Sequence, residues 1–549
     1  MPAAVTIDPR VHARRWWTLA VLCLSLLLIV AGNSSLNVAL PPIQDALGSS
    51  QSQLQWMVDA YSLVFAGLLL PAGAIADRFG RKWALQGGLV VFLLASLAAS
   101  VATASWQLIL WRAVTGLGAA FIMPGTLSVL NNVFVEVREK QRAIAVWAGC
   151  AGLGGALGPV LSGLLLRHFA WGSVFLINVI ICVVAIAAGL ALVPDSSDPH
   201  EAKLDPVGAV LAVTGLTGLL YGIIEGPENG WSSPVTMVSI AAGLLVLGAF
   251  GAWERRAAHP MLDMGLFRVR EFNVGSLTIT LQYVAAYGFF FVGIQYFQIA
   301  HGYSPLTAAL LSLPIGAFSM VGAPLSARLV ERYGPRAVVG VGLLLSSAGL
   351  AMFGGVTPTT SVVLFVGAAA LIGMGLGQTT APSTTLIMTS VPRAKSGVGS
   401  AVNDLSRELG GALGIAVLGS ILSTAYRHQV GPKLARIPGV PDGASSSVFA
   451  SLEAARHLPA ATAEQVTHLA TSSFADAFGI AMLAGAAVLL LNSVLVWVRQ
   501  VRPGSASGVH LEDVGPAEAP HPDGRDGARS AEPAGAESRA PDRGDRYRG

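Results

Sequence analysis

The chain has 549 residues, of which 53% are apolar and only 12% are charged, with a net charge of +3. Soluble domains carry about a quarter charged residues, so this balance excludes an ordinary soluble protein and favours a chain that lies mostly in a membrane. The small net charge gives no reason to expect nucleic acid as a partner. The three cysteines lie in apolar runs without CxxC spacing, so we expect no disulfide framework, no metal and no cofactor.

A membrane helix needs about 20 apolar residues to cross roughly 30 Å of hydrocarbon. Fourteen runs meet this requirement, and the first is too long for the core of a signal peptide. They lie near residues 17–40, 54–75, 83–104, 106–130, 143–166, 171–193, 204–224, 235–253, 272–299, 304–329, 337–356, 361–388, 397–425 and 474–498. The sequence therefore predicts an all-α polytopic membrane protein with fourteen transmembrane helices.

Lysine and arginine residues fall almost entirely on alternate loops between these runs. With the N-terminus inside, 21 of them lie in inner segments and only Arg167 lies in a short outer loop. Because cytoplasmic loops are enriched in Lys and Arg, this alternation predicts that both termini are cytoplasmic. The preference for Arg over Lys, with heavy use of Ala, Gly and Val, indicates a GC-rich bacterial genome and therefore a bacterial cell (inner) membrane protein. After residue 500 the composition changes to Pro, Gly, Ala, Ser and mixed charges, which predicts a disordered cytoplasmic tail over 501–549.

Short sequences recur about 255 residues apart. The hexapeptide at 153–158 returns unchanged at 409–414 as LGGALG, and the tetrapeptide DRFG at 77–80 is echoed at 331–334 by ERYG. These offsets, 256 and 254 residues, equal eight predicted spans, which indicates two pseudo-symmetric six-helix halves of the kind found in one large transporter class. The predicted units are a cytoplasmic N-terminus (1–15), a six-helix bundle (16–194), two inserted helices (204–254), and a second six-helix bundle (270–500) with a long outer loop (426–473).

The loop between the second and third predicted spans reads GAIADRFGRK over residues 73–82. This loop, with the motifs below, resembles the major facilitator superfamily, and specifically its fourteen-span drug:proton antiporter group, over about residues 15–500. The resemblance implies that the loop is a conformational latch, made in one state and broken in the other. The alternative is that its charges only anchor an inner loop. The latch residues are Gly73, Asp77, Arg78, Gly80, Arg81 and Lys82.

Two further motifs lie in the fourth and fifth predicted spans. Residues 108–118, LILWRAVTGLG, resemble the span-four motif of the family, which implies a part in proton coupling for Arg112. A guanidinium inside an apolar helix is costly without a cavity or a partner, and the alternative is that Arg112 extends to the membrane interface. Residues 158–163 resemble the antiporter motif of exporters, with Ser162 where glycine is usual. The residues assigned to this motif are Gly154, Gly158, Pro159 and Gly163.

The span-one signature departs from the family at one position. The family usually has an acid five residues before Asn37, and this chain has Gly32 there. Proton coupling therefore needs another carboxylate, tuned by burial or by a neighbouring arginine. The candidates, beside Arg112, are Asp59 in the second span and Asp404, Arg407 and Glu408 in span thirteen. The span-thirteen acids are one helical turn apart, and the alternative for them is exposure to cytoplasmic water.

Candidate cavity residues combine aromatic and amide side chains, which suit a bulky, partly apolar compound, although packing or lipid contact is the alternative. They are Asn33, Asn37, Gln282, Tyr283, Tyr287 and Gln295. We expect a monomeric secondary active exporter of drug-like or antibiotic-like amphipathic small molecules, driven by proton influx through alternating access. The alternatives are an exporter of a lipid, amino acid or siderophore on the same fold, a proton-independent uniporter, or a channel. A membrane enzyme is disfavoured because the sequence contains no HExxH, GxSxG or P-loop motif.

Overall fold

The computed structural model describes residues 9–196, 205–258, 260–356, 360–391 and 396–499, and the predicted tail over 501–549 lies outside them. Within these ranges the chain forms helices and no strand, as the sequence predicts. The α-helices are α1 (Pro9–Leu47), α2 (Gln51–Phe79), α3 (Arg81–Ser100), α4 (Ser105–Val133), α5 (Val137–Leu165), α6 (Ser173–Leu192), α7 (Pro206–Asn229), α8 (Pro234–Glu254), α9 (Arg270–Ile299), α10 (Pro305–Met352), α11 (Val362–Thr389), α12 (Ser396–Leu434), α13 (Val448–Arg456) and α14 (Ala460–Val498). Short 3-10 helices are η1 (Leu266–Arg268), η2 (Phe353–Gly355) and η4 (Asp442–Ser446).

Twelve of the described helices are long and apolar enough to cross a membrane. One of them, α10, consists of two helices joined at Gly334, whose backbone (φ 80°, ψ 160°) is not helical. The apolar part of α5, Gly152–Leu165, is shorter than a full span. Dividing α10 at Gly334 and including α5 gives fourteen segments at the predicted places. That all fourteen cross the membrane stays a prediction.

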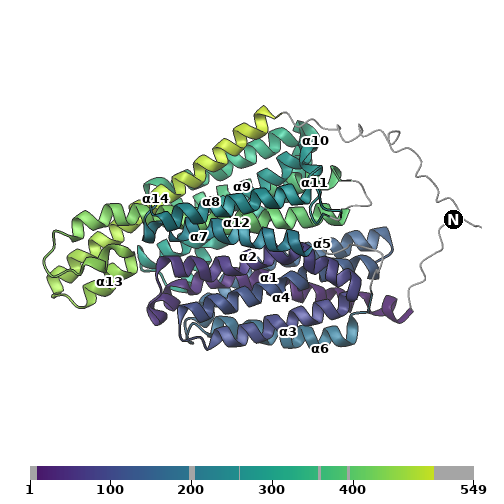
Figure 1. Ribbon diagram of the computed structural model, residues 1–549, viewed down its shortest axis with the longest axis horizontal. Helices are drawn as coiled ribbons and strands as arrows, with labels where there is room; N and C mark the ends of the chain where they lie inside the picture. The colour runs from purple at the N-terminus through teal and green to yellow at the C-terminus, as the bar shows by residue number, and fades with distance from the viewer. Residues whose placement is uncertain (1–8, 197–204, 259, 357–359, 392–395, 500–549) are drawn as a thin grey trace, which may run out of the picture. The chain divides into compact units, whose positions relative to one another are not determined.

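The two halves of the chain pack their helices in the same pattern (Figure 1). In the first half, α1 contacts α4, α5 and α6, while α4 contacts α2 and α3, and α3 contacts α6. In the second half, α9 contacts α11, α12 and α14, while α11 and α14 both contact α10. Because α10 contains the counterparts of both α2 and α3, each of these first-half contacts has an equivalent in the second half. The structure thus confirms two pseudo-symmetric helical bundles.

The tetrapeptide repeat adopts the same unusual backbone in each half. Gly80 separates α2 from α3 with a φ of 117°, and Gly334, 254 residues later, divides α10 with a φ of 80°. Glycine adopts such positive angles freely, whereas other residues are strained there. Both turns therefore require the glycine that the repeat supplies.

The hexapeptide repeat lies where two helices approach closely. A Cβ on Gly158 of α5 would lie 2.7 Å from the carbonyl oxygen of Ala31 in α1. At the equivalent position in the second half, a Cβ on Gly414 of α12 would overlap the carbonyl oxygen of Val284 in α9. Small residues let membrane helices pack at short range, so the repeat encodes the tight pairs α1–α5 and α9–α12.

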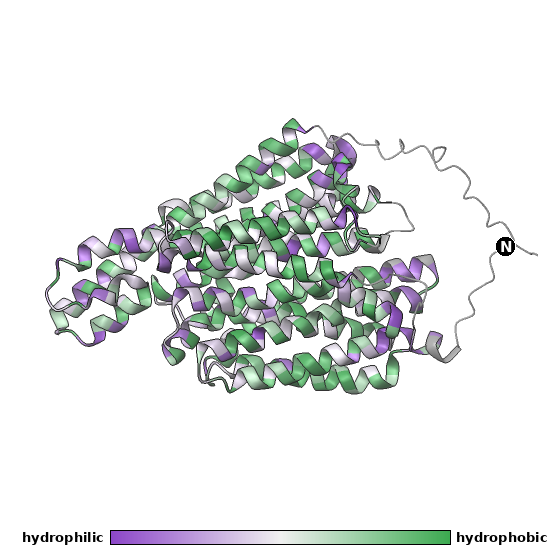
Figure 2. Cartoon of the chain, in the orientation of Figure 1, coloured by the Kyte–Doolittle hydropathy of each residue, from purple (hydrophilic) through white to green (hydrophobic). Residues whose placement is uncertain are grey.

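The helices run between two ends of the bundle. The Gly80 end carries the turns at 80, 134–136 and 334, whereas the α13 end carries the turns at 48–50 and 101–104 together with α13. Hydrophilic residues gather toward both ends, and the stretch between them is mainly hydrophobic (Figure 2). This distribution fits helices whose middle parts lie in hydrocarbon.

The apolar core differs between the two ends. At the α13 end one cluster joins both halves, and includes Leu54 of α2 and Phe291 of α9. Toward the Gly80 end the first half has its own cluster around Leu22, whereas the second half has a cluster around Phe272 and the far part of the shared cluster, including Val274. The halves are therefore packed against each other at the α13 end, and each is stabilised on its own at the Gly80 end.

The two inserted helices pack against each other, and α7 also contacts α2 of the first half and α12 of the second. α8 lies outside α7 and leaves much of its apolar surface uncovered, including Val238 and Leu245, which are 65% and 74% exposed. An apolar helix face without protein contacts suits lipid.

The predicted outer loop over 426–473 is largely helical. α12 continues to Leu434, α14 begins at Ala460, and together with α13 they project past the ends of the other helices (Figure 1). Ser447 caps α13 by accepting a hydrogen bond from the Ala450 amide at 3.1 Å. Hydropathy marks only the part of a helix that suits lipid, which is why it did not predict these extensions.

Candidate functional site

Arg112 of α4 is buried inside the bundle, with 1% of its surface exposed. Its Nε donates to the carbonyl oxygen of Met57 at 2.9 Å, and its Nη2 donates to Oδ1 of Asn33 at 2.9 Å. Its guanidinium carbon lies 4.5 Å from the centre of the Tyr61 ring. These three partners are neutral, so hydrogen bonds and a cation–π contact hold the charge, which does not extend to the membrane interface.

Position 32, where the family usually has an acid, faces α3 and α6. A Cβ on Gly32 would lie 3.3 Å from Nδ2 of Asn178 and 3.3 Å from Cζ of Phe92. The next residue, Asn33, is the one whose side chain reaches Arg112. An amide thus occupies the place beside the arginine in this chain.

Asp59 of α2 is fully buried, and neither of its carboxylate oxygens has a hydrogen-bond partner among the described residues. Burying a carboxylate without a partner is costly unless a proton or a cation binds to it. Acidic residues within membrane helices commonly serve proton or ion pathways for this reason. The surroundings of Asp59 are those expected of a proton-binding group.

The three charged residues predicted in span thirteen lie together on α12 and are half-buried. Asp404 accepts a hydrogen bond from Nδ2 of Asn403 at 3.3 Å. The guanidinium carbon of Arg407 lies 5.6 Å from the centre of the Tyr283 ring in α9. Oε2 of Glu408 has no partner within the described part of the chain. This cluster differs from Asp59 because its groups keep some exposed surface.

Tyr61 of α2 packs against Arg112, and the sequence pattern did not single it out. Its ring covers the guanidinium, and its buried hydroxyl has no hydrogen-bond partner among the described residues. Met57, whose carbonyl oxygen binds the same arginine, is one helical turn before Tyr61. The sequence carries no signal for Tyr61, because its place beside Arg112 depends on how α2 packs against α4.

The predicted cavity residues of α9 divide into two groups. Tyr283 and Tyr287 are half-buried beside α12, with ring centroids 5.6 Å apart. Gln282 instead donates to Oγ of Ser346 in α10 at 3.2 Å, and Gln295 donates to the backbone of its own helix. Gln282 and Gln295 are 1% and 0% exposed, so they are packed within the second half. Only the two tyrosines lie with the charged groups.

The second predicted amide in α1, Asn37, lies in the core that the halves share at the α13 end. It is 7% exposed, and its Oδ1 has no partner among the described residues. Gln55 of α2 is also buried at this end, and both polar atoms of its side chain lack a described partner. The closed contact between the halves thus contains polar groups that no described side chain or backbone group satisfies.

The predicted latch is paired within the first half. Oδ1 of Asp77 accepts from Nε of Arg81 at 2.6 Å, and Nζ of Lys82 donates to the carbonyl oxygen of Leu190 at the end of α6 at 2.9 Å. Arg78 is exposed. These contacts fix the turn between α2 and α3 to its own half in this conformation.

A second ion pair at the Gly80 end joins α1 to α5. Arg15 donates from Nε and Nη2 to the two carboxylate oxygens of Glu139, both at 2.8 Å. This hydrogen-bonded arginine lowers the pKa of the Glu139 carboxyl below its ordinary value. In the same half, a Cβ on Gly73 of α2 would make ordinary contact with Pro124 of α4 at 3.5 Å.

The predicted antiporter motif lies on α5, between α1 and α10. Gly154 and Gly158 face α1, where any side chain on Gly158 would collide. Gly163 faces the other half, because its Cβ would lie 2.6 Å from Cα of Leu306 in α10. Pro159 lies inside the same helix. The motif therefore brings α5 into close contact with its own half and with the opposite one.

A bundle of apolar helices, divided into two similar halves with buried charges at their seam, defines a membrane transport protein. The model of the Major Facilitator Superfamily matches residues 22–415, and the chain belongs to this family. It is a multi-pass membrane protein, and the sequence-based identification is confirmed.

The chain is similar to named proteins over most of its length. It is 35% identical to the multidrug efflux pump LfrA of Mycolicibacterium smegmatis, in a match that covers 89% of this chain and 97% of that one. It is 34% identical to the methyl viologen resistance protein SmvA of Salmonella typhimurium, over 88% of this chain and 98% of that one. A crystal structure of a bacterial homologue of the human lysosomal transporter Spinster, inward-facing and unoccupied, has a TM-score of 0.61 at 19% identity, covering 91% of this chain and all of that one. This last likeness concerns the fold alone.

Proposed function

We propose that the protein is a secondary active exporter of drug-like or antibiotic-like amphipathic molecules, coupled to proton influx by alternating access. Relatives named as a multidrug efflux pump and as a methyl viologen resistance protein, matched over nearly their whole length, support export of such compounds. On this proposal the chain is a transporter and not an enzyme, and it works as a monomer in a bacterial cell membrane.

In this proposal the Gly80 end faces the cytoplasm, with both termini on that side. The turns at this end are rich in Lys and Arg, including Arg78, Arg81, Lys82 and Arg138, as cytoplasmic loops are. The shared core at the α13 end and the separate cores at the Gly80 end then correspond to a conformation that admits substrate from the cytoplasm.

The observation that carries the proposal is the presence of carboxylates on both sides of the seam between the halves, one of which, Asp59, has no hydrogen-bond partner among the described residues. Asp59 and Glu408 lie on α2 and α12, which contact each other across that seam. Separation of the halves changes the surroundings of both carboxylates, so proton binding and conformation are thermodynamically linked. Tyr283 and Tyr287 provide aromatic faces for a cationic substrate, and the carboxylates provide the opposite charge.

The test uses purified protein in liposomes that contain a pH-sensitive dye. Under an imposed proton gradient, methyl viologen and ethidium should drive proton movement, and Asp59→Asn or Glu408→Gln should reduce it at least about tenfold. Glu453→Gln on α13 is the matched control, because its side chain is 58% exposed and pairs with Arg456 and His457, which are close by in the chain. Substrate transport without proton movement would contradict the coupling and leave a uniporter. Failure to transport either compound would contradict the proposed substrate class.

A further inference from the structure

The inserted helix α7 lies on the seam between the halves. Its residues Leu220 and Ile224 share an apolar cluster with Leu63 of α2 and with Ala412 and Ala416 of α12. One inserted helix therefore contacts both halves at once, on the side where α2 meets α12.

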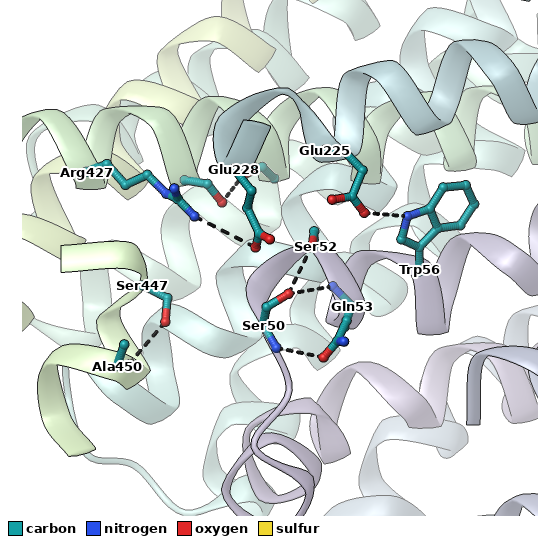
Figure 3. Close-up of polar contacts among 11 residues, drawn as sticks. Ser50, Ser52, Gln53, Trp56, Glu225, Glu228, Arg427, Ser447 and Ala450 are labelled. Atoms are coloured by element: carbon teal, nitrogen blue, oxygen red, sulfur yellow. Dashed lines mark hydrogen bonds and ion pairs between the residues drawn. The ribbon is translucent and has the colours of Figure 1, made fainter. Parts of the chain in front are cut away.

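In the described part of the chain, one hydrogen bond ties the end of α7 to the first half. Nε1 of Trp56 in α2 donates to Oε1 of Glu225 in α7 at 3.1 Å, and Figure 3 shows the two side chains meeting between these helices. The indole of Trp56 also lies 6.4 Å from the ring of Tyr221 on α7. An indole donor and a carboxylate acceptor form a charge-assisted bond, which is stronger than a neutral one.

Three polar contacts tie the same end of α7 to the second half. Oγ of Ser420 in α12 donates to the carbonyl oxygen of Ile223 at 2.7 Å. Nε1 of Trp231 donates to Oγ1 of Thr424 at 3.1 Å, and Arg427 forms an ion pair with Glu228 at 3.8 Å. Figure 3 shows this ion pair beside the Trp56–Glu225 contact. We call the contacts of residues 221–231 with α2 and α12 the α7 bridge.

The α7 bridge lies next to a cleft of about 1090 Å³ at the α13 end. Glu228 and Arg427 line this cleft, and so do Gln44 of the first half and Gln298 of the second. Water in the cleft therefore reaches the edge of the bridge. A tie between the halves at this place can be exchanged for hydrogen bonds to water when they separate.

We propose that the α7 bridge holds the halves together at the α13 end, that α7 moves with the second half, and that the Trp56–Glu225 hydrogen bond breaks on each opening. Among the described residues, one polar tie connects residues 221–231 to the first half and three connect them to the second, so the first is the weaker polar attachment. Trp56 and Glu225 are then positioning residues, which set the balance between the two conformations without touching substrate. This inference rests on the proposed alternating access.

The test measures conformation directly. Spin labels are placed at Ala46→Cys on α1 and Leu310→Cys on α10, which are exposed at the α13 end, one in each half. The background lacks the native cysteines Cys23, Cys150 and Cys182. Distances between the labels are measured by double electron–electron resonance in lipid nanodiscs without substrate. Trp56→Phe and Glu225→Ala should each raise the long-distance population about tenfold or more, the effect of losing one charge-assisted hydrogen bond.

Two variants separate this bond from general damage. Glu225→Gln keeps an oxygen that accepts from the indole, and it should shift the population less than Glu225→Ala. Trp253→Phe removes an indole of the same chemistry, which donates to both oxygens of Asp205 at 3.0 and 2.9 Å but joins only α8 to α7. It should leave the distances as in the parent protein.

Two results would overturn the inference. One is a parent-like distance distribution in both Trp56→Phe and Glu225→Ala, and the other is an equal shift in Trp253→Phe. Because the distances are read without transport, the outcome is independent of the liposome assay. If the distances shift while no substrate moves, the proposed substrate class fails and the α7 bridge stands.

Discussion

The two halves of this chain share their packing but not their charges. Gly158 and Gly414 are equivalent, 256 residues apart, and each lets its helix pass close to the backbone of a neighbour. At the same offset, the first-half residue that matches Glu408 is Gly152. The repeat therefore preserves the helix packing, whereas the charged residues differ between the halves.

The charges that differ lie where the halves meet. The first half contributes Arg112 with neutral partners and an unpaired Asp59, both buried. The second half contributes the half-buried acids of α12 beside Arg407. Two similar scaffolds thus form an asymmetric polar site.

The shared packing is tested by adding one methyl group to each half. Gly158→Ala and Gly414→Ala place a Cβ against a backbone carbonyl oxygen, so both should lose at least about 1–3 kcal/mol of stability and much of the folded protein. Thermal unfolding in detergent measures this loss. Gly152→Ala is the control, because a Cβ there meets nothing within 4 Å. Destabilisation in only one half would contradict the shared packing.

The charge of the first half is tested by Arg112→Ala. This change removes two charge-assisted hydrogen bonds of about 1.5–3 kcal/mol each, so transport should fall about a hundredfold or more. Ethidium efflux from cells with matched protein levels gives the rate. Arg112→Lys, which keeps the charge but not the planar donor geometry, should retain part of the activity. A parent-like rate in Arg112→Ala would remove the arginine from the site.

Asn33→Asp gives the first half a carboxylate at the place where it has an amide. The new group would pair with Arg112 and neutralise it, so we expect a rise in melting temperature and a fall in transport of about tenfold. Asn33→Ala separates the lost hydrogen bond from the added charge. Unchanged transport in Asn33→Asp would show that the neutral surroundings of the arginine do not matter.

The smallest effect concerns Glu139, which lies at the Gly80 end away from the seam. Arg15 lowers the pKa of this carboxyl in the folded protein, so the pair stabilises above the ordinary glutamate pKa of about 4.3 and stops doing so as the pH falls through the folded pKa. The melting temperature of Glu139→Gln should therefore lie slightly below the parent at pH 7 and converge with it at acidic pH. A difference that persists at acidic pH would assign the effect to packing instead.

Most of the fold follows from the sequence because lipid imposes a simple rule on helices. Apolar runs and the alternation of Lys and Arg located the spans, and the repeated glycines identified the related halves. The extension of α12 to Leu434 and of α14 back to Ala460 did not follow, since a polar helix outside the membrane resembles a loop in hydropathy. The division of α10 did follow, since the two predicted spans near 304–329 and 337–356 lie on either side of the non-helical Gly334.

The site was predictable only where a residue stands out from its surroundings. Arg112 and Asp59 are charges in apolar runs, so sequence analysis selected them. Tyr61 was missed because an aromatic residue in a membrane helix is ordinary, and its role depends on which neighbours its ring meets. Gln282 was selected for a cavity but binds Ser346, because composition does not tell which face of α9 turns inward.

The apolar core shared by the halves at the α13 end has a thermal consequence. Separating the halves there hydrates apolar surface, and such hydration carries a positive heat-capacity change. Stabilisation by apolar burial weakens on cooling, so a lower temperature favours the conformation that is open at this end. Opening also lets water bind the side chains of Asn37 and Gln55, which lack described partners in the closed conformation. The balance between the two conformations therefore depends on temperature in a curved way, and a van't Hoff plot of their ratio should not be straight.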